Sequence, residues 1–311
     1  MKGEVFSERA AFMQRWKNPR LMMILSAVVF GTIGVFKRHI PLSASQVALY
    51  RAVMAVMVLG GYLLLSGQKI IGHGLKKKLP LLLLSGGAMD FNWVLLFEAY
   101  THTTVSAATL AYYLGPLLAA ILCPLLFKER MNGRQWVCVL ISALGLALIT
   151  GFGDPAAASN HLLGVGLGLG AAALYASVML LNKAIDGVPA LQRTLLQFVA
   201  ASLVLLPYTM LTDSPAPAPM TAGNWAALIT LGVIHTGIIY CLYFSALRQL
   251  PGQQAAILSY IDPLTAVLLS VFLLGEGMTE IQILGGAMIL GGALGNEIRP
   301  AAKEKIISLK G

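Results

Sequence analysis

The chain carries little charge. Only 11% of its 311 residues are Asp, Glu, Lys or Arg, whereas 57% are hydrophobic. A soluble globular protein carries about 25% charged residues, so this composition excludes an ordinary soluble domain and indicates a protein that crosses a membrane several times. The formal net charge of +9 does not indicate a nucleic-acid partner, because the basic residues lie between apolar stretches and form no soluble basic face.

Cysteines are few and catalytic motifs are missing. Cys123, Cys138 and Cys241 all fall within apolar stretches, where their spacing fits neither a disulfide framework nor a metal site. The sequence has no GxSxG, P-loop or HExxH motif, and the GLGLG of residues 166–170 lies in an apolar stretch, where glycines serve helix packing. We therefore expect no enzyme activity, no catalytic residues, no bound metal and no cofactor.

Apolar stretches long enough to cross a bilayer, which takes about 20 residues, recur along the chain. They are separated by Pro, Gly and charged residues, and the pattern predicts an all-α integral membrane protein with ten transmembrane helices. The predicted ranges are 20–36, 44–65, 79–99, 105–127, 135–152, 163–182, 191–211, 225–247, 253–274 and 282–298.

The positions of Lys and Arg predict the orientation of these helices, because cytoplasmic loops are enriched in both residues. With the N-terminus inside, 19 of the 22 Lys and Arg residues are cytoplasmic, Lys37 and Arg38 are outside, and Arg51 lies within a span. Both termini are therefore expected in the cytoplasm. The predicted location is the plasma membrane, which is the inner membrane of a bacterium, and the lipid bilayer is the expected surrounding of the multi-pass chain.

The chain contains one unit twice. With an offset of 147 positions, residues 108–145 align with residues 255–292. The aligned pairs include Tyr113 with Tyr260, Pro116 with Pro263, and Glu129 with Glu276. The turn at residues 128–130 reads KER in the first copy, whereas residues 275–277 read GEG in the second. Because basic turns stay in the cytoplasm, the two copies are predicted to have opposite orientations, as two inverted-topology five-helix repeats (5+5).

This repeat divides the chain into five parts. We predict a cytoplasmic N-terminal segment at 1–19, a first repeat at 20–152, an external loop at 153–162, a second repeat at 163–298 and a basic cytoplasmic tail at 299–311. Since one chain supplies both halves of a pathway, the repeat permits a monomer.

Both copies resemble the EamA domain of the drug/metabolite transporter superfamily. The resemblance is carried by residues 97–149 and 244–294, which share an aromatic before a small-apolar pair, a mid-span proline, an acidic turn and a glycine-rich final span. Two such domains cover almost the whole chain. The resemblance implies a secondary transporter of amino acids, other metabolites or drugs, and the outward direction that we expect comes from the resemblance alone.

Charged groups inside a span are costly, so they mark candidate functional residues. Arg51, Asp90, Glu98 and Asp262 lie within the predicted spans, and the rise of about 1.5 Å per residue in a helix places Asp90 and Asp262 near mid-membrane. Pro116 and Pro263, which the repeat relates, predict broken helices at the same depth. Broken helices in corresponding halves are typical of transporter binding sites.

Two sets of candidates follow. The predicted substrate-binding residues are Arg51, Asp90, Trp93, Tyr112, Tyr113, Gly115, Pro116, His235, Tyr240, Tyr260, Asp262 and Pro263. The predicted coupling or gating residues are Asp90, Glu98, His235, Glu129 and Glu276. In this hypothesis Arg51 suits a carboxylate, the two aspartates suit an amine, and the aromatic residues suit an apolar side chain.

Each candidate also has a structural alternative. Asp262 suits the N-cap of a half-helix that begins at Pro263. Asp90 suits an interhelical hydrogen bond, Arg51 and Glu98 suit an ion pair, and His235 suits a hydrogen-bonded packing position. The aromatic residues are also common as packing groups.

The sequence predicts a secondary transporter that moves small metabolites outwards by alternating access, with amino acids and related compounds as the first expectation. An organic-cation or drug exporter is one alternative and would use Asp90 and Asp262 but not Arg51. A lipid carrier with a cavity open to the side is another. A lipid-modifying enzyme needs paired acid and base or metal residues, and a channel needs a continuous polar stripe or filter, which these spans lack.

Overall fold

The computed structural model describes residues 18–65, 75–127, 132–150, 155–185, 187–213, 219–247, 249–250 and 252–297. All regular secondary structure within these ranges is helical. The candidate Glu129, residues 1–17 of the predicted N-terminal segment, residues 153–154 of the predicted external loop and the tail at 299–311 lie outside the described residues.

Each predicted span is occupied by one helix or by consecutive helices. The first part of the chain forms α2 (Pro19–Gly31), α3 (Ile33–Arg38), α4 (Ala44–Leu65), α5 (Leu75–His102), α6 (Val105–Tyr112), α7 (Gly115–Phe127) and α8 (Gly133–Thr150). The second part forms α9 (Pro155–Ala184), α10 (Ala190–Thr212), α11 (Ala222–Ile229), the π-helix η1 (Thr230–Ile238), α12 (Ile239–Leu247), α13 (Gly252–Ser259), α14 (Ile261–Phe272) and α15 (Glu280–Glu297).

Length and composition make several of these helices suitable for crossing a membrane. Among the described residues, seven helical stretches are long and apolar enough to do so, and three further apolar helices are shorter. Large apolar side chains point outwards from them, and Leu64, Leu211 and Phe272 are more than 80% exposed. Such side chains suit contact with lipid, since helices satisfy their backbone hydrogen bonds internally.

The largest difference from a predicted boundary is at the start of α9. Helix α9 begins at Pro155, within the segment that the sequence analysis expected to be an external loop. Proline has a fixed φ that fits the first helical position, where its missing N–H has no helical partner to lose. The helix therefore takes in the residues that follow Pro155, despite their polar character at Asn160 and His161.

The helices break where the repeat-related prolines stand. Helix α6 ends before Tyr113, and α7 begins at Gly115 with Pro116 in its first turn. In the second copy α13 ends at Ser259, and α14 contains Pro263 in its first turn. The sequence did not predict a third break at Thr32, between α2 and α3, where the Thr32 hydroxyl donates to the carbonyl of Val29 at 2.7 Å.

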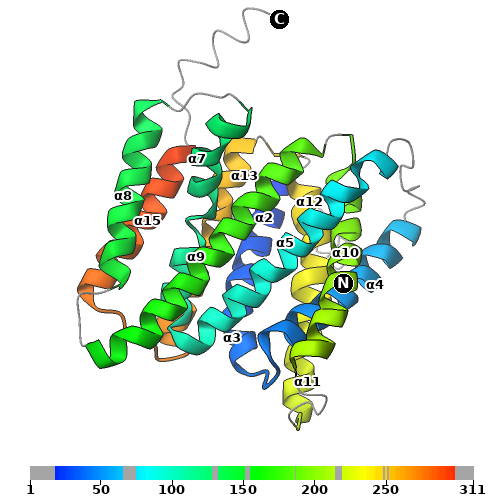
Figure 1. Ribbon diagram of the computed structural model, residues 1–311, viewed down its shortest axis with the longest axis horizontal. Coiled ribbons are helices and arrows are strands. Elements are labelled where there is room, and N and C mark those ends of the chain that lie inside the picture. The colour runs from blue at the N-terminus through cyan, green and yellow to red at the C-terminus, as the bar shows by residue number, and fades with distance from the viewer. Residues whose placement is uncertain are drawn as a thin grey trace, which may run out of the picture.

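Pairs of helices far apart in the sequence pack side by side. Helix α8 lies along α15 at one end of the molecule, while α4 packs on α10 and on η1 at the other (Figure 1). Helix α5 packs along α9 between them. The α8–α15 contact is especially close at Gly145 and Gly285, because a Cβ atom placed on Gly145 would lie 2.5 Å from the carbonyl oxygen of Gly285.

We expect Gly145→Ala to destabilise the protein. The added methyl group would push α8 away from α15, and overpacking of this kind costs roughly 1–3 kcal/mol. Thermal unfolding of the purified protein in detergent, followed by tryptophan fluorescence, measures the loss. Gly291→Ala on α15 is the matched control, since a Cβ there meets nothing within 4 Å. An unchanged melting temperature for Gly145→Ala would contradict the close approach of the two helices.

Candidate functional site

A cavity of about 550 Å³ lies among the helices. Its described lining comes from α2, α3, α5, α6, α7, α9, α10, α12, α13 and α14. The volume falls within the range of about 300–1,000 Å³ that is usual for sites of small organic ligands. Because so many helices contribute, any shift of one group of helices against another changes the shape of the cavity.

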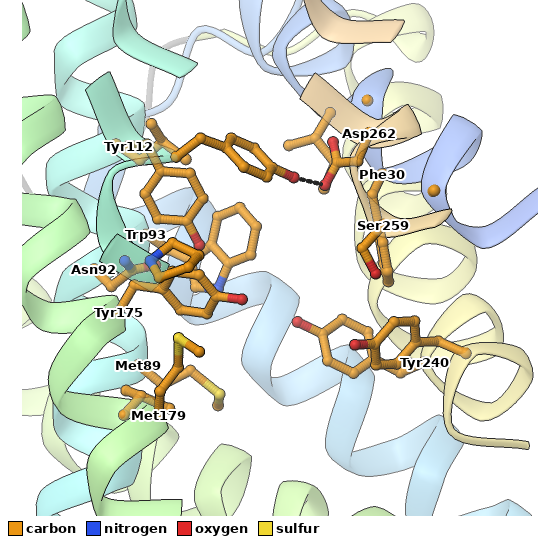
Figure 2. Close-up of a pocket in the computed structure, with 18 of the residues that line it drawn as sticks. Phe30, Met89, Asn92, Trp93, Tyr112, Tyr175, Met179, Tyr240, Ser259 and Asp262 are labelled. Atoms are coloured by element: carbon orange, nitrogen blue, oxygen red, sulfur yellow. Dashed lines mark hydrogen bonds between the residues drawn. The ribbon is translucent and has the colours of Figure 1, made fainter. Parts of the chain in front are cut away.

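The wall of this cavity is strongly aromatic. Ten of its described lining residues carry aromatic rings, namely Phe30, Trp93, Tyr100, Tyr112, Tyr113, Tyr175, Tyr240, Tyr243, Phe244 and Tyr260. Tyr112 stacks on Tyr175 with ring centroids 5.2 Å apart, and Phe30 meets Tyr240 edge-on at 5.3 Å. Figure 2 shows Trp93, Tyr112 and Tyr175 on one side of the open space and Phe30, Tyr240 and Asp262 on the other. The rings therefore face one another across the space available to a ligand.

The three helix breaks that the structure describes inside predicted spans all border the cavity. Gly31 and Ile33 flank the break at Thr32, and both line the cavity. Tyr113 and Tyr260, the repeat-related residues at the other two breaks, also line it, and their ring centroids are 6.4 Å apart. The two predicted helix breaks thus meet at a shared space in the molecule.

Asp262 is the one carboxylate among the described lining residues. Its Oδ2 accepts a short hydrogen bond from the Tyr113 hydroxyl, so residues of the two repeats are linked across the cavity (Figure 2). The interpretation of Asp262 as an N-cap is wrong, since the cap position of α14 is Tyr260 and no side chain caps that helix. Asp262 lies instead in the first turn, where the helix dipole favours a negative charge.

Polar side chains gather at another part of the wall. Arg193, which is the one basic residue of the described lining, donates from Nη1 to the carbonyls of Asn182 and Ile185, both at 3.2 Å. Gln197 donates to the side chain of Asn182 at 2.8 Å. Arg193 is one of the 19 Lys and Arg residues that the sequence analysis counted as cytoplasmic, and only its neighbours in space reveal that it lines the cavity.

The structure brings together many of the predicted substrate-binding residues. Those that line the cavity are Trp93, Tyr112, Tyr113, Pro116, Tyr240, Tyr260 and Asp262. Gly115 and Pro263 lie directly beside this set and shape the helix breaks. A Cβ atom on Gly115 would lie 2.6 Å from the ring of Tyr175, so a larger residue would displace a cavity wall. The sequence analysis missed Tyr175 and Tyr243, which no local motif marks.

Five predicted substrate-binding residues do not line the cavity, and three of them lie apart from Gly115 and Pro263. Arg51, Asp90 and His235 are each 2% exposed and lie between helices. His235 packs as its structural alternative expected. Its Nδ1 donates to the carbonyl of Thr230 at 3.0 Å, and its Nε2 lies 2.6 Å from the Thr32 hydroxyl.

The predicted ion pair between Arg51 and Glu98 is absent from the described contacts. Glu98 lies 3.4 Å from His102 on the next turn of α5, and Arg51 donates to Thr236 at 3.0 Å. The pair was an interpretation of their positions along the predicted spans, which place both residues towards the outer side of the membrane. The structure separates the two residues because Arg51 points towards η1 and the ring of Trp93 instead.

Glu276 joins three segments that are distant in the sequence. Its carboxylate accepts from Arg38 at 2.6 Å, from the backbone N–H of Val105 at 2.7 Å and from the Ser270 hydroxyl. The end of α3, the start of α6 and the turn after α14 are therefore held together. We refer to this set of bonds as the Glu276 latch.

Comparison with known proteins explains this architecture. The family model described as "EamA-like transporter family" matches residues 19–151 and again 162–296. The chain belongs to this family. A relative named uncharacterized transporter YxxF, from Bacillus subtilis, is 32% identical over 92% of this chain and 91% of its own length.

An uncharacterized transporter of Archaeoglobus fulgidus is 28% identical over 88% of this chain and 93% of its own length. A crystal structure with 18% identity aligns over 89% of this chain and 96% of its own with a TM-score of 0.61, which shows a shared fold. This EamA-family protein is therefore a multi-pass membrane protein of a transporter family.

We expect the cavity to be open to aqueous reagents. Ser259 lines it, whereas Ser26 on α2 is fully buried outside it. In a background without native cysteines, a small thiol reagent should modify Ser259→Cys quickly and leave Ser26→Cys largely unmodified. Mass spectrometry of the intact protein measures both rates. Equal protection of the two cysteines would contradict an accessible cavity.

Proposed function

We propose that this protein is a secondary transporter that exports small amphipathic amines, including amino acids and related compounds, across the plasma membrane by alternating access. The observation that carries the proposal is the position of Asp262. A single carboxylate, oriented by Tyr113, faces an aromatic cavity at the point where two repeat-related helices break.

The chemistry of the wall suits an amine with an apolar body. An ammonium group gains from a carboxylate and from the faces of aromatic rings, which attract cations by about 0.5–2 kcal/mol each. The rings and the methionines Met89 and Met179 offer apolar contact to the remainder of the substrate (Figure 2). The described lining has a mixed rather than a purely apolar surface, which suits a metabolite better than a lipid tail.

Packing between repeat-related spans supports the proposed 5+5 arrangement. Helices α8 and α15, which the sequence repeat relates, pack on each other. Helix α6 packs on α14, and these two helices belong to the repeat-related spans at 105–127 and 253–274. Helix α5 packs on α9, and α12 packs on α2 in the corresponding way. Two halves related in this manner can rock about a central cavity, which is the usual basis of alternating access.

The position of the Glu276 latch supports the view that the cavity is closed on the outer side of the membrane. In the proposed topology Arg38 and Glu276 lie on the outer side of the membrane, and the latch ties helices there. The polar lining at Arg193 and Asn182 lies towards the cytoplasmic side in the same topology. We infer that the structure is closed to the outside and that the latch must open for release.

An organic-cation exporter is the second candidate. It is favoured by one specific observation, namely that Arg51 does not line the cavity whereas Asp262 and ten aromatic residues do. A substrate with a positive charge and no carboxylate would fit those groups. The two candidates share the amine-binding role of Asp262 and differ in how the rest of the substrate is recognised.

We expect Asp262→Asn to weaken amine binding and transport. Loss of the charge removes a charge-assisted hydrogen bond, which corresponds to roughly 10- to 100-fold in affinity. Uptake of labelled amines and amino acids into proteoliposomes measures the effect. Glu280→Gln is the matched control, because Glu280 is an exposed acid in the first turn of α15. Equal transport by wild type and Asp262→Asn would remove the main support for the proposal.

We expect Glu276→Gln to open the outer side more often. The neutral amide accepts weaker hydrogen bonds from Arg38 and Val105, so the latch loses stability. The measurement is the rate at which a membrane-impermeant thiol reagent, added outside, modifies Thr109→Cys within the cavity. The rate should rise in Glu276→Gln and stay unchanged in the Glu280→Gln control. A rate that Glu276→Gln does not alter would exclude the latch as an outer gate.

A further inference from the structure

Arg51 is a buried guanidinium with unused donors. The residue lies in α4 and is 2% exposed, and its Nε donates to the Thr236 hydroxyl oxygen at 3.0 Å. Its Nη1 and Nη2 are buried without any hydrogen-bond partner. A guanidinium presents five donors in a rigid fork, and leaving charged donors unpaired in a buried position is costly. The Nη1 and Nη2 atoms of Arg51 therefore lack a hydrogen-bond acceptor.

The surroundings hold this fork in a fixed orientation. The central carbon of the guanidinium lies 4.0 Å from the centre of the Trp93 ring and 5.1 Å from that of Phe97. Thr236, which accepts from Nε, donates in turn to the carbonyl of Leu231 at 2.9 Å, five residues earlier in the π-helix η1. π-Helical turns occur frequently at functional sites. Here the unusual turn places the hydroxyl that orients Arg51.

The fork lies directly behind the cavity wall. Trp93, on which the guanidinium stacks, lines the cavity. Three other wall residues, Tyr100, Tyr112 and Tyr240, lie within electrostatic reach of the same guanidinium. One side-chain ring thus separates two unused donors from the space that a substrate occupies.

Asp90 is a second buried ionisable residue near the fork, and no direct bond joins the two among the described contacts. Its Oδ2 is buried and has no hydrogen-bond partner, and it lies on the same face of α5 as Trp93, one turn earlier. Both side chains therefore have polar atoms without a hydrogen-bond partner beside the same wall. A partner supplied by the substrate would relieve the cost at Arg51.

We propose that Arg51 is the carboxylate-binding residue of this transporter, and that its Nη1 and Nη2 receive the substrate carboxylate when the Trp93 ring turns aside. The inference rests on the proposed function and narrows it. The substrate is a zwitterion whose carboxylate binds at Arg51 while its ammonium group remains in the aromatic cavity. A planar carboxylate matches the guanidinium fork through two parallel hydrogen bonds, which a simple organic cation cannot form.

The experiment compares three probes that differ at one position. L-leucine carries the carboxylate, leucinamide replaces it with a neutral amide, and 3-methylbutylamine lacks it. Dissociation constants are measured with the purified full-length protein in lipid nanodiscs. The variants are Arg51→Gln, Arg51→Lys and the control Arg20→Gln, since Arg20 is exposed at the start of α2, away from the cavity.

We expect wild type to bind L-leucine more tightly than both analogues. Arg51→Gln should lose on the order of 10- to 100-fold in affinity for L-leucine alone, which is the effect of losing charge-assisted hydrogen bonds. Arg51→Lys should recover only part of the loss, because an ammonium group cannot offer the two-pronged fork. Arg20→Gln should match wild type for every probe.

Several results would overturn the inference. If Arg51→Gln weakens all three probes equally, Arg51 has a structural role only. If wild type binds 3-methylbutylamine as tightly as L-leucine, and Asp262→Asn abolishes both, the proposed amine transport stands and the carboxylate site fails. If wild type binds none of the probes, both proposals fail. Thermal unfolding of each variant shows whether Arg51→Gln still folds, and Arg51→Lys keeps the test valid if it does not.

Discussion

The whole structure depends on one constraint, which is that backbone N–H and C=O groups in a bilayer have no water to bind. They must pair within the protein, so the regular structure of the described residues is helical throughout. Irregular backbone is tolerated only where it is buried in protein or borders a cavity. The breaks at Thr32, Tyr113 and Tyr260 obey this rule, since residues beside each of them line the same cavity. The location of the cavity therefore follows from where the chain stops being helical.

Sequence patterns predicted two of these three breaks. Pro116 and Pro263 each remove a backbone donor, which is a signal that can be read without any structure. Thr32 carries no such signal. The hydroxyl and the backbone N–H of Thr32 both donate to the carbonyl of Val29, the N–H at 3.0 Å, and these bonds stabilise the break. Such local hydrogen bonds compete with the helical ones, but a threonine in a membrane helix does not always break it.

The sequence predicted how deep a residue lies in the membrane, but it did not predict towards which neighbour its side chain points. Hydropathy and the rise per residue place Arg51, Asp90 and Asp262 within the membrane, yet only Asp262 among them faces the cavity. In a soluble helix the apolar face shows which side is buried. In these spans both lipid and protein interior are apolar, so the pattern along α4 or α5 is nearly uniform around the helix. For the same reason the sequence did not predict that Tyr175 and Arg193 line the cavity.

In the proposed function, the Tyr113–Asp262 hydrogen bond connects substrate recognition with substrate release. A carboxylate left without a partner inside a membrane is costly, and the Tyr113 hydroxyl reduces this cost when no substrate is bound. In the proposed function, a substrate amine must then compete with, or share, that hydroxyl. Such competition lowers the affinity of the site, and a transporter benefits because it must release what it binds. Tyrosine suits this position better than phenylalanine, since its ring continues the aromatic wall while its hydroxyl keeps the acid oriented between transport cycles.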